Sequence, residues 1–188
     1  MMSPAIDLGA ATRTTEAPLP FDLLYAAHAA GVHRFCVSQL GDTTAAEDIT
    51  HDTFVRAYMA YERARPEAAT VRTWLLSIAR NLVADDYRRR SRWRRWLAWQ
   101  RQEAPAAPDV EVVATNRARL REVAAAMQGL RRRDRELIGL RIAADLSLRE
   151  VAHVLGMSEA AAKVAAQRAL QRLRQRLDAD PEAQGEKS

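Results

Sequence analysis

The stretch LSLREVAHVLGMSEAAAKV, from Leu146 to Val164, decides how the chain is interpreted, because it has helical character on both sides of one glycine. Ser147 and Glu150 have the spacing of a capping box, in which each side chain satisfies a free backbone N–H at a helix start. Gly156 suits the left-handed position that ends a helix, and Ser158 suits the N-cap of the next helix. Two short helices around a tight turn predict a helix-turn-helix, whose second helix can enter a DNA major groove. A helical corner inside a hydrophobic core would give the same pattern.

The composition favours an all-α protein. The 188 residues include only seven glycines and seven prolines, and no run alternates apolar and polar residues as a half-buried strand does. No segment has the length and apolarity of a membrane span, and residues 1–20 lack the pattern of a signal peptide, so we expect a cytoplasmic protein. The single cysteine, Cys36, is expected to be a small core residue.

Positive charge is concentrated in one part of the chain. The net charge is +5, and the stretch from Arg88 to Arg101 is rich in arginine and contains no acid. A local cationic block is typical of a surface that binds phosphate or another acidic partner, although a solvated basic helix has the same composition. Trp93, Trp96 and Trp99 lie among these arginines. We expect them to anchor the helix on its domain, and stacking on bases or docking onto a partner is the alternative.

The pattern of apolar residues divides the chain into two helical domains. Helices are predicted over 21–40, from 45 to about 63 and from 71 to about 90, and more follow a Pro- and Ala-rich linker that contains EAPAAPDVE (103–111). The predicted fold class is therefore all-α, with two small helical domains joined by a flexible linker. The predicted boundaries are a disordered leader at 1–20, a first domain at 21–100, a linker at 101–116, a second domain at 117–178 and a disordered tail at 179–188.

The second predicted helix carries a polar stripe opposite its apolar face. Asp48, Asp52 and Arg56 follow one another at four-residue intervals, with His51 beside them. These side chains could ligate a metal across one helical turn, but a solvated acidic face is the simpler explanation. The expected buried positions are Ile49, Thr53, Ala57 and Ala60 on one stripe and Phe54, Tyr58 and Tyr61 on the next.

The third predicted helix has a polar side that is unusually basic. Arg72, Arg80 and Asn81 lie on or near this side, and an alternative role for Asn81 is a buried amide that satisfies backbone groups. Asp85 and Asp86 are expected to pair with the arginines that follow them by three or four residues. The expected core side consists of Leu75, Ile78, Ala79, Leu82 and Val83.

Signatures of catalysis are absent from the sequence. It contains no Gly-rich phosphate loop, no Cys or His pairs with zinc spacing and no nucleophile elbow. We therefore expect neither an enzyme nor a metal site, and the sequence favours a protein that works by binding.

Two separated blocks of the sequence resemble one family. LGDTTAAEDITHDTFVRAYMAY (40–61), followed by VRTWLLSIARNLVADDYRRR (71–90), resembles region two of the extracytoplasmic-function (ECF) sigma factors. LRRRDRELIGLRIAADLSLREVAHVLGMSEAAAKVAAQRALQRLR (130–174) resembles their region four. The two blocks occur in the order of the family, with a linker between them, and the resemblance covers about 21–177. Two ordered blocks are far more specific than one helix-turn-helix.

The resemblance implies a dissociable subunit of bacterial RNA polymerase that recognises promoters. Region two would bind the clamp helices of the largest polymerase subunit and read and melt the minus-ten element, and region four would hold the flap and read the minus-thirty-five element. An anti-sigma factor is the implied regulator, and no cofactor is implied. The implied site residues are Asp48, His51, Asp52 and Arg56 for core polymerase; Arg72, Arg80, Asn81, Arg88 and Arg89 for the downstream element; and Ser158, Lys163, Val164, Gln167 and Arg168 for the upstream element.

Some details of the sequence depart from the family pattern. Val164–Ala165 stands where Ser-Arg is common, so the upstream element would be read largely through Lys163 and Arg168. Asp145 occupies a turn position normally held by glycine, which Asp tolerates better than most residues. By resemblance, the loop from Ala64 to Thr70 captures an extruded base. The positions expected to face the core from the last helix are Ala162, Ala166, Ala169 and Leu173.

Two other classes of protein remain as alternatives. A stand-alone helix-turn-helix regulator with an N-terminal helical domain would bind DNA without polymerase, whereas a sigma factor needs core polymerase to act at promoters. A helical adaptor that binds only protein would show no dependence on promoter DNA. A gel shift with and without core polymerase distinguishes these classes.

Overall fold

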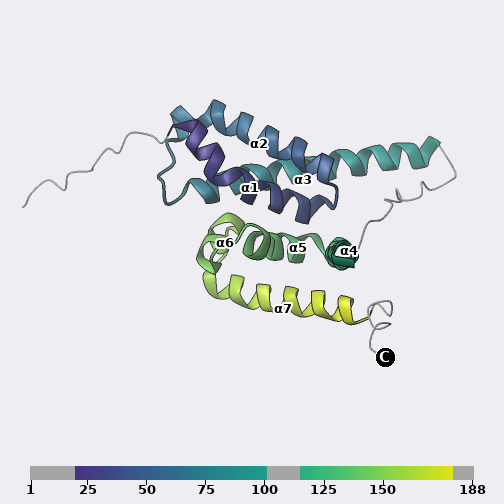
Figure 1. Ribbon diagram of the computed structural model, residues 1–188. Helices are drawn as coiled ribbons and strands as arrows, with labels where there is room; N and C mark the ends of the chain where they lie inside the picture. The colour runs from purple at the N-terminus through teal and green to yellow at the C-terminus, as the bar shows by residue number, and fades with distance from the viewer. Residues whose placement is uncertain (1–19, 101–114, 180–188) are drawn as a thin grey trace, which may run out of the picture.

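The computed structural model describes residues 20–100 and 115–179, and within these ranges the secondary structure consists of helices (Figure 1). The first region comprises α1 (Phe21–Leu40), α2 (Thr43–Ala64) and α3 (Val71–Gln100). The second comprises α4 (Thr115–Gln128), α5 (Arg132–Ile138), the π-helical turn η1 (Gly139–Ala143), α6 (Leu148–Leu155) and α7 (Glu159–Asp178). The predicted all-α class with two helical regions is confirmed. The expected leader, linker and tail fall almost entirely outside the described residues.

Two adjacent residues make the turn between α1 and α2. Gly41 ends α1 in the left-handed region, at φ 69°, and its N–H donates to the Val37 carbonyl at 2.9 Å. Asp42 then caps α2, because its carboxylate accepts a hydrogen bond from the Ala45 N–H at 3.1 Å. The chain reverses here, so that Phe21 at the start of α1 packs edge-on against Tyr61 near the end of α2.

The third helix is longer than the sequence analysis predicted. It was expected to end near Arg90 and continues to Gln100. The added residues are dominated by Arg, Trp, Leu and Ala and include neither glycine nor proline, so nothing in them interrupts a helix. The C-terminal part of α3 therefore projects beyond the other helices (Figure 1).

The core of the first region follows the predicted apolar faces with a few differences. Tyr58 was expected to be buried and is 67% exposed. Its ring packs edge-on against Phe21, the first residue of α1. Leu76 was not predicted and is 1% exposed. Ala60 and Ile78 are only partly buried. The other predicted positions of α2 and α3 are buried as expected.

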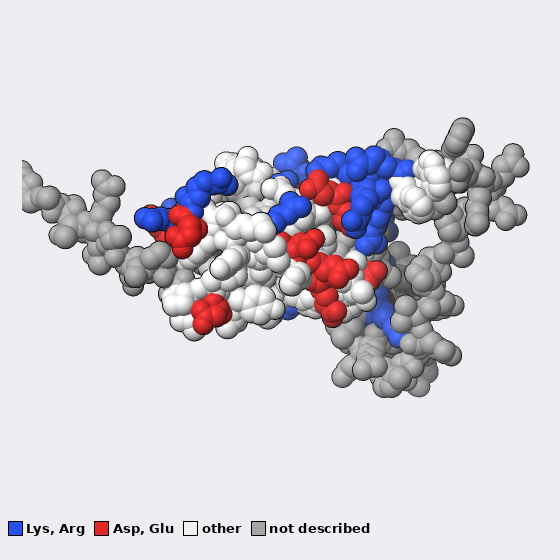
Figure 2. All heavy atoms as spheres, turned by 90° about the horizontal axis from the view of Figure 1, so that it is seen from above, with Lys and Arg blue, Asp and Glu red and all other residues white. Residues whose placement is uncertain are grey.

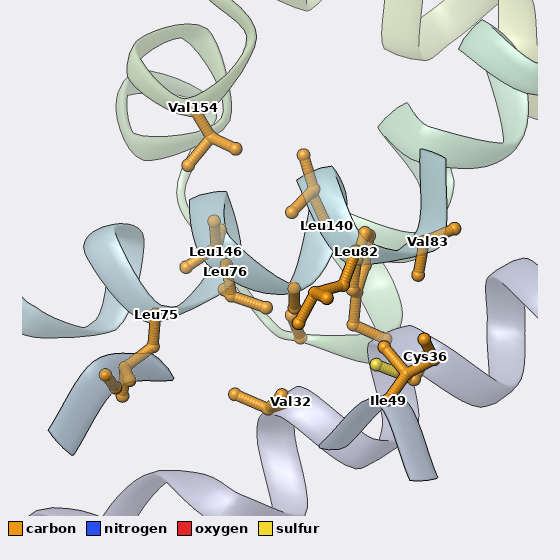
Figure 3. Close-up of a cluster of buried hydrophobic side chains, with 14 of the residues drawn as sticks. Val32, Cys36, Ile49, Leu75, Leu76, Leu82, Val83, Leu140, Leu146 and Val154 are labelled. Carbon is orange, nitrogen blue, oxygen red and sulfur yellow. The ribbon is translucent and has the colours of Figure 1, made fainter. Parts of the chain in front are cut away.

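One hydrophobic core is shared by both regions. The largest cluster of buried residues contains Val32, Leu76 and Leu82 of the first region together with Leu140 and Leu146 of the second. Figure 3 shows these side chains in the same cluster, contributed by helices on both sides. The two regions therefore pack against one another and are not joined by the linker alone.

The second region also has a smaller core of its own, formed by Met127, Leu130, Ile138, Ala169 and Leu173. Ile142 is 57% exposed although it is a large apolar residue. It lies in the π-helical turn, whose wider hydrogen-bonding pattern shifts the residues that follow relative to an α-helical face. Among the described helices, none combines the length and the apolarity needed to cross a bilayer.

Candidate functional site

The helix-turn-helix has the local chemistry that the sequence predicted. The Ser147 N–H donates to the Glu150 carboxylate at 2.7 Å, and the Glu150 N–H donates to the Ser147 hydroxyl oxygen at 3.2 Å. The hydrogen bond from Ser147 holds the pKa of the Glu150 carboxyl below its usual value. Gly156 ends α6 at φ 64° and ψ 42°, in the left-handed region, and Ser158 caps α7 by accepting from the Ala161 N–H at 3.2 Å.

The turn before α6 contains a strained residue that the sequence also indicated. Asp145 has φ 54°, one of two non-glycine residues with positive φ in the described ranges. Leu146, which follows it, donates its N–H to the Leu140 carbonyl at 3.0 Å, and its own carbonyl accepts from Arg141 Nη1 at 3.1 Å. These bonds hold the entry to α6 in a fixed geometry.

The last helix, α7, presents one buried and one exposed face. All four residues predicted to face the core are buried. The residues predicted to contact DNA, Lys163, Val164, Gln167 and Arg168, are all exposed on the other side, next to the exposed cap Ser158. The capped turn thus fixes where this exposed, mainly polar face of α7 begins.

The polar stripe of α2 lies in a groove beside α3. Asp48, His51, Asp52 and Arg56 are all exposed, as predicted. Figure 2 shows acidic side chains in a band next to a group of basic ones on this face. The groove has a volume of about 600 Å³, and the residues that line it are Ala45, Asp48, Ile49, His51, Asp52, Arg56, Leu82, Asp85, Asp86, Arg88, Arg89, Arg90 and Arg92.

The counter-charges predicted for the arginines of α3 are present. Asp85 pairs with Arg88, and Asp86 pairs with Arg89 at 2.7 Å. Asp86 also pairs with Arg90, at 2.6 Å, and is itself buried. Because these guanidinium groups remain largely exposed, the acids position them without removing them from solvent.

The other polar residues predicted on α3 have different environments. Asn81 is exposed, so the alternative in which it satisfies backbone groups inside the core is wrong. Arg72 and Arg80 are partly buried against the second region. Arg72 Nη2 donates to the carbonyls of Ala144 and Asp145, the latter at 2.8 Å. Arg80 Nε lies 3.5 Å from a carboxylate oxygen of Glu136.

Comparison with known proteins identifies the family of this chain. The model of Sigma-70 region 2 matches residues 24–93, and the model of Sigma-70, region 4 matches residues 120–173. The ECF RNA polymerase sigma factor ShbA of Streptomyces griseus is 33% identical over 168 residues, which cover 85% of this chain and 87% of ShbA. The chain belongs to the ECF RNA polymerase sigma factors. We refer to α1–α3 as region two and to α4–α7 as region four.

Two further comparisons describe the extent of the similarity. The sigma factor is 31% identical to the ECF RNA polymerase sigma factor BldN of Streptomyces coelicolor over 165 residues. The match covers 85% of this chain and 61% of BldN, so this chain spans less than two thirds of the length of that relative. The solved structure of CnrH in complex with the cytosolic domain of CnrY matches with a TM-score of 0.63 and 28% identity, covering 85% of this chain and 88% of CnrH.

The tryptophans of the sigma factor do not anchor α3 as expected. The rings of Trp93 and Trp96 stack on one another, with centroids 4.7 Å apart, and the two residues are 57% and 44% exposed. The prediction that they pack against the domain is therefore wrong for this pair, because α3 has already left the body of the protein where they occur. The side chain of Trp99 lies outside the described residues.

No residues with the arrangement of a metal site were found in the described ranges. Cys36 is fully buried, and burial raises the pKa of its thiol to about 11. It is a core residue of the sigma factor, as predicted.

A polar contact between the regions was not predicted from the sequence. Arg135 of region four is buried and donates from Nη1 to the Gln39 carbonyl at 3.0 Å and to the Tyr87 hydroxyl at 2.8 Å. Gln39 is fully buried, and its Nε2 donates to the Arg135 carbonyl at 3.1 Å. The one available signal was Gly139, an isolated glycine within a helical pattern, since such a glycine often marks close packing.

Proposed function

We propose that this sigma factor directs core RNA polymerase to a specific set of promoters. The observation that carries this proposal is the exposed face of α7, which a capped turn holds away from the core in a member of the ECF family. In this proposal α7 enters the major groove of the minus-thirty-five element, where Lys163 and Arg168 contact bases or phosphates.

Region two reads and opens the minus-ten element in the same proposal. The loop from Ala64 to Thr70 receives an extruded base, and the exposed Asn81 contacts the separated strand. Arg88 and Arg89 supply backbone contacts, which their exposed guanidinium groups allow. Holding unstacked bases costs a few kcal/mol per base, so opening requires both a base pocket and these phosphate contacts.

The acidic stripe of α2 is the proposed surface for the clamp helices of the polymerase. Asp48 and Asp52 are exposed one helical turn apart, and no residue described in the structure covers them. Region four contacts the polymerase flap in this proposal. The protein acts in the cytoplasm by binding and catalyses no reaction of its own.

An anti-sigma factor is the proposed regulator of this protein. CnrH, which has a similar fold and is 28% identical over the matched residues, was solved in complex with the cytosolic domain of CnrY. A regulator of this kind would compete with core polymerase, so adding it to a transcription reaction would reduce initiation.

In-vitro transcription with core polymerase on a library of promoter fragments tests the proposal. We expect transcripts from a subset of fragments that share two sequence elements, and only when the sigma factor and core polymerase are both present. A sigma factor that shifts DNA equally well without polymerase would support a stand-alone regulator. A protein that gives no promoter-dependent transcript with any fragment would overturn the proposed function.

A further inference from the structure

The projecting end of α3 carries an exposed pair of aromatic side chains. Trp93 and Trp96 lie three residues apart, so both rings emerge from the same side of the helix. The ring centroids are 4.7 Å apart, the angle between the ring planes is 28°, and the two residues are 57% and 44% exposed. The two rings therefore form one apolar patch in contact with solvent. Large apolar side chains that are exposed side by side are typical of a binding surface.

Positive charge without a balancing carboxylate lies at the same end of α3. The stretch 87–102 contains seven arginines and no acid. The first three of these arginines, at 88–90, are each paired with Asp85 or Asp86. Arg92 is exposed and forms no ion pair with another residue that the structure describes. Figure 2 shows the basic side chains gathered toward one end of this face.

The position of the tryptophan pair suits a broad surface better than a single nucleic-acid strand. Proteins that stack bases on aromatic side chains usually place them in a basic groove that follows the strand. A groove does lie between α2 and α3, but neither Trp93 nor Trp96 lines it. The two tryptophans instead lie on the part of α3 that projects beyond the other helices (Figure 1). A flat surface can therefore reach them without contact with the rest of region two.

The surface of an anionic bilayer has groups that match both the rings and the charge. Tryptophan concentrates at the level of the lipid headgroups, where its ring contacts apolar groups and its N–H stays hydrated. Guanidinium groups donate paired hydrogen bonds to phosphate oxygens. A basic helix that carries tryptophan is typical of segments that lie in the interface of a membrane.

We propose that Trp93, Trp96 and Arg92 form a docking site for the anionic surface of a membrane. The two rings enter the headgroup layer, and the guanidinium group binds lipid phosphate. The site involves no contact with the promoter, so the inference goes beyond the proposed function and does not depend on it.

Cosedimentation of the full chain with lipid vesicles tests the docking site. Wild type should bind vesicles of phosphatidylglycerol and phosphatidylcholine in equal parts at least about ten-fold more tightly than vesicles of phosphatidylcholine alone. Trp93→Ala combined with Trp96→Ala should weaken binding to the anionic vesicles by about ten-fold, and Arg92→Glu should also weaken it. Binding should fall as salt is raised from about 0.1 M to about 1 M, because the Debye length shortens from about 10 Å to about 3 Å.

Two control variants make similar changes at other exposed positions. Met59→Ala combined with Ile142→Ala removes side chains that are 79% and 57% exposed. Arg149→Glu makes the same change in charge as Arg92→Glu, at an exposed position of α6. Both controls should bind anionic vesicles as wild type does. Circular dichroism checks that the variants fold, and Arg92→Glu tests the site without altering the aromatic pair.

The possible outcomes separate a membrane from other partners. Equal binding of anionic vesicles by wild type and by the Trp93, Trp96 variant would overturn the proposal, and so would equal binding of neutral and anionic vesicles by wild type. Unchanged vesicle binding with weaker binding to promoter DNA or core polymerase would assign the pair to those partners instead. Failure of the proposed function would appear separately, as wild-type holoenzyme that does not transcribe.

Discussion

Arg172 of α7 donates from one nitrogen, Nη1, to both carboxylate oxygens of Asp134 in α5, at 2.9 and 3.0 Å. The carboxylate is nearly buried, whereas the arginine side chain is 46% exposed. This ion pair joins α7, the proposed recognition helix, to α5. The orientation of α7 is therefore fixed at its middle by a charged pair as well as at its start by Ser158.

Loss of this pair should destabilise region four. We expect Asp134→Ala to lower the free energy of unfolding by about 1 to 2 kcal/mol, because a charge-assisted hydrogen bond is lost while one partner keeps access to solvent. Urea denaturation measures the change. In a double-mutant cycle, Asp134→Ala should add little to Arg172→Ala. Fully additive effects would mean that the two side chains do not act together.

The proposed role of Arg168 gives a second prediction. Arg168→Ala should weaken promoter binding by the holoenzyme by about 1 to 3 kcal/mol and leave binding to core polymerase unchanged. Arg174→Ala is the matched control, because Arg174 is an exposed arginine further along the same helix. A holoenzyme gel shift in which both variants resemble wild type would remove Arg168 from the DNA surface.

The acidic stripe gives a third prediction. Asp48→Arg combined with Asp52→Arg should abolish assembly with core polymerase without unfolding the protein, since both side chains are exposed and like charges would meet at the interface. A pull-down with core polymerase measures assembly. Asp22→Arg combined with Glu62→Arg makes the same change in charge at exposed positions outside the stripe. Undiminished binding by the Asp48, Asp52 variant would show that the stripe is not the interface.

Strand opening is the subject of the fourth prediction. Asn81→Ala should still allow the holoenzyme to bind duplex promoter but should reduce the melted bubble, which permanganate footprinting detects. A premelted template should restore most of the transcription. Because Asn81 is exposed, the melting temperature of the free protein should be unchanged. A normal bubble in the variant would contradict the proposed contact with the separated strand.

The turn glycine gives the fifth prediction. A Cβ at Gly156 would meet no atom within 4 Å among the described residues, so the cost of substitution comes from its φ of 64° alone. We expect Gly156→Ala to lower the free energy of unfolding by about 1 to 2 kcal/mol, and Gly156→Asn to lower it by less, because Asn tolerates the left-handed region. Equal losses in thermal denaturation would indicate a steric cause instead.

Local chemistry made several features of the fold predictable. The capping box at Ser147 and the left-handed Gly156 each depend on a few neighbouring residues, and both occur as expected. The positive φ of Asp145 agrees with the turn position that the resemblance to the family implied. The buried and exposed faces of α7 were predictable for the same reason, since a helix of regular period can be divided by composition alone. Which of its exposed residues contact DNA stays a prediction.

Tertiary packing was not predictable in the same way. The exposure of Tyr58 and of the Trp93–Trp96 pair depends on where neighbouring helices end, and the sequence pattern of a single helix contains no such information. The contact of Arg72 and Arg80 with region four is also a property of distant segments. An arginine can donate to phosphate, carboxylate or carbonyl oxygens, so residue type alone could not decide between these partners.

Gln39 Oε1 and Arg135 Nε, at the interface between the regions, are among the buried polar atoms that lack a hydrogen-bond partner within the described residues. Each would gain hydration if the regions separated, and an unsatisfied buried polar group costs about 1 to 3 kcal/mol. Part of the free energy gained by apolar contact between the regions is therefore lost in dehydrating these atoms. Because water would satisfy these atoms wherever the packing loosens, we expect the stability of the contact between the regions to respond to solutes that change the activity of water.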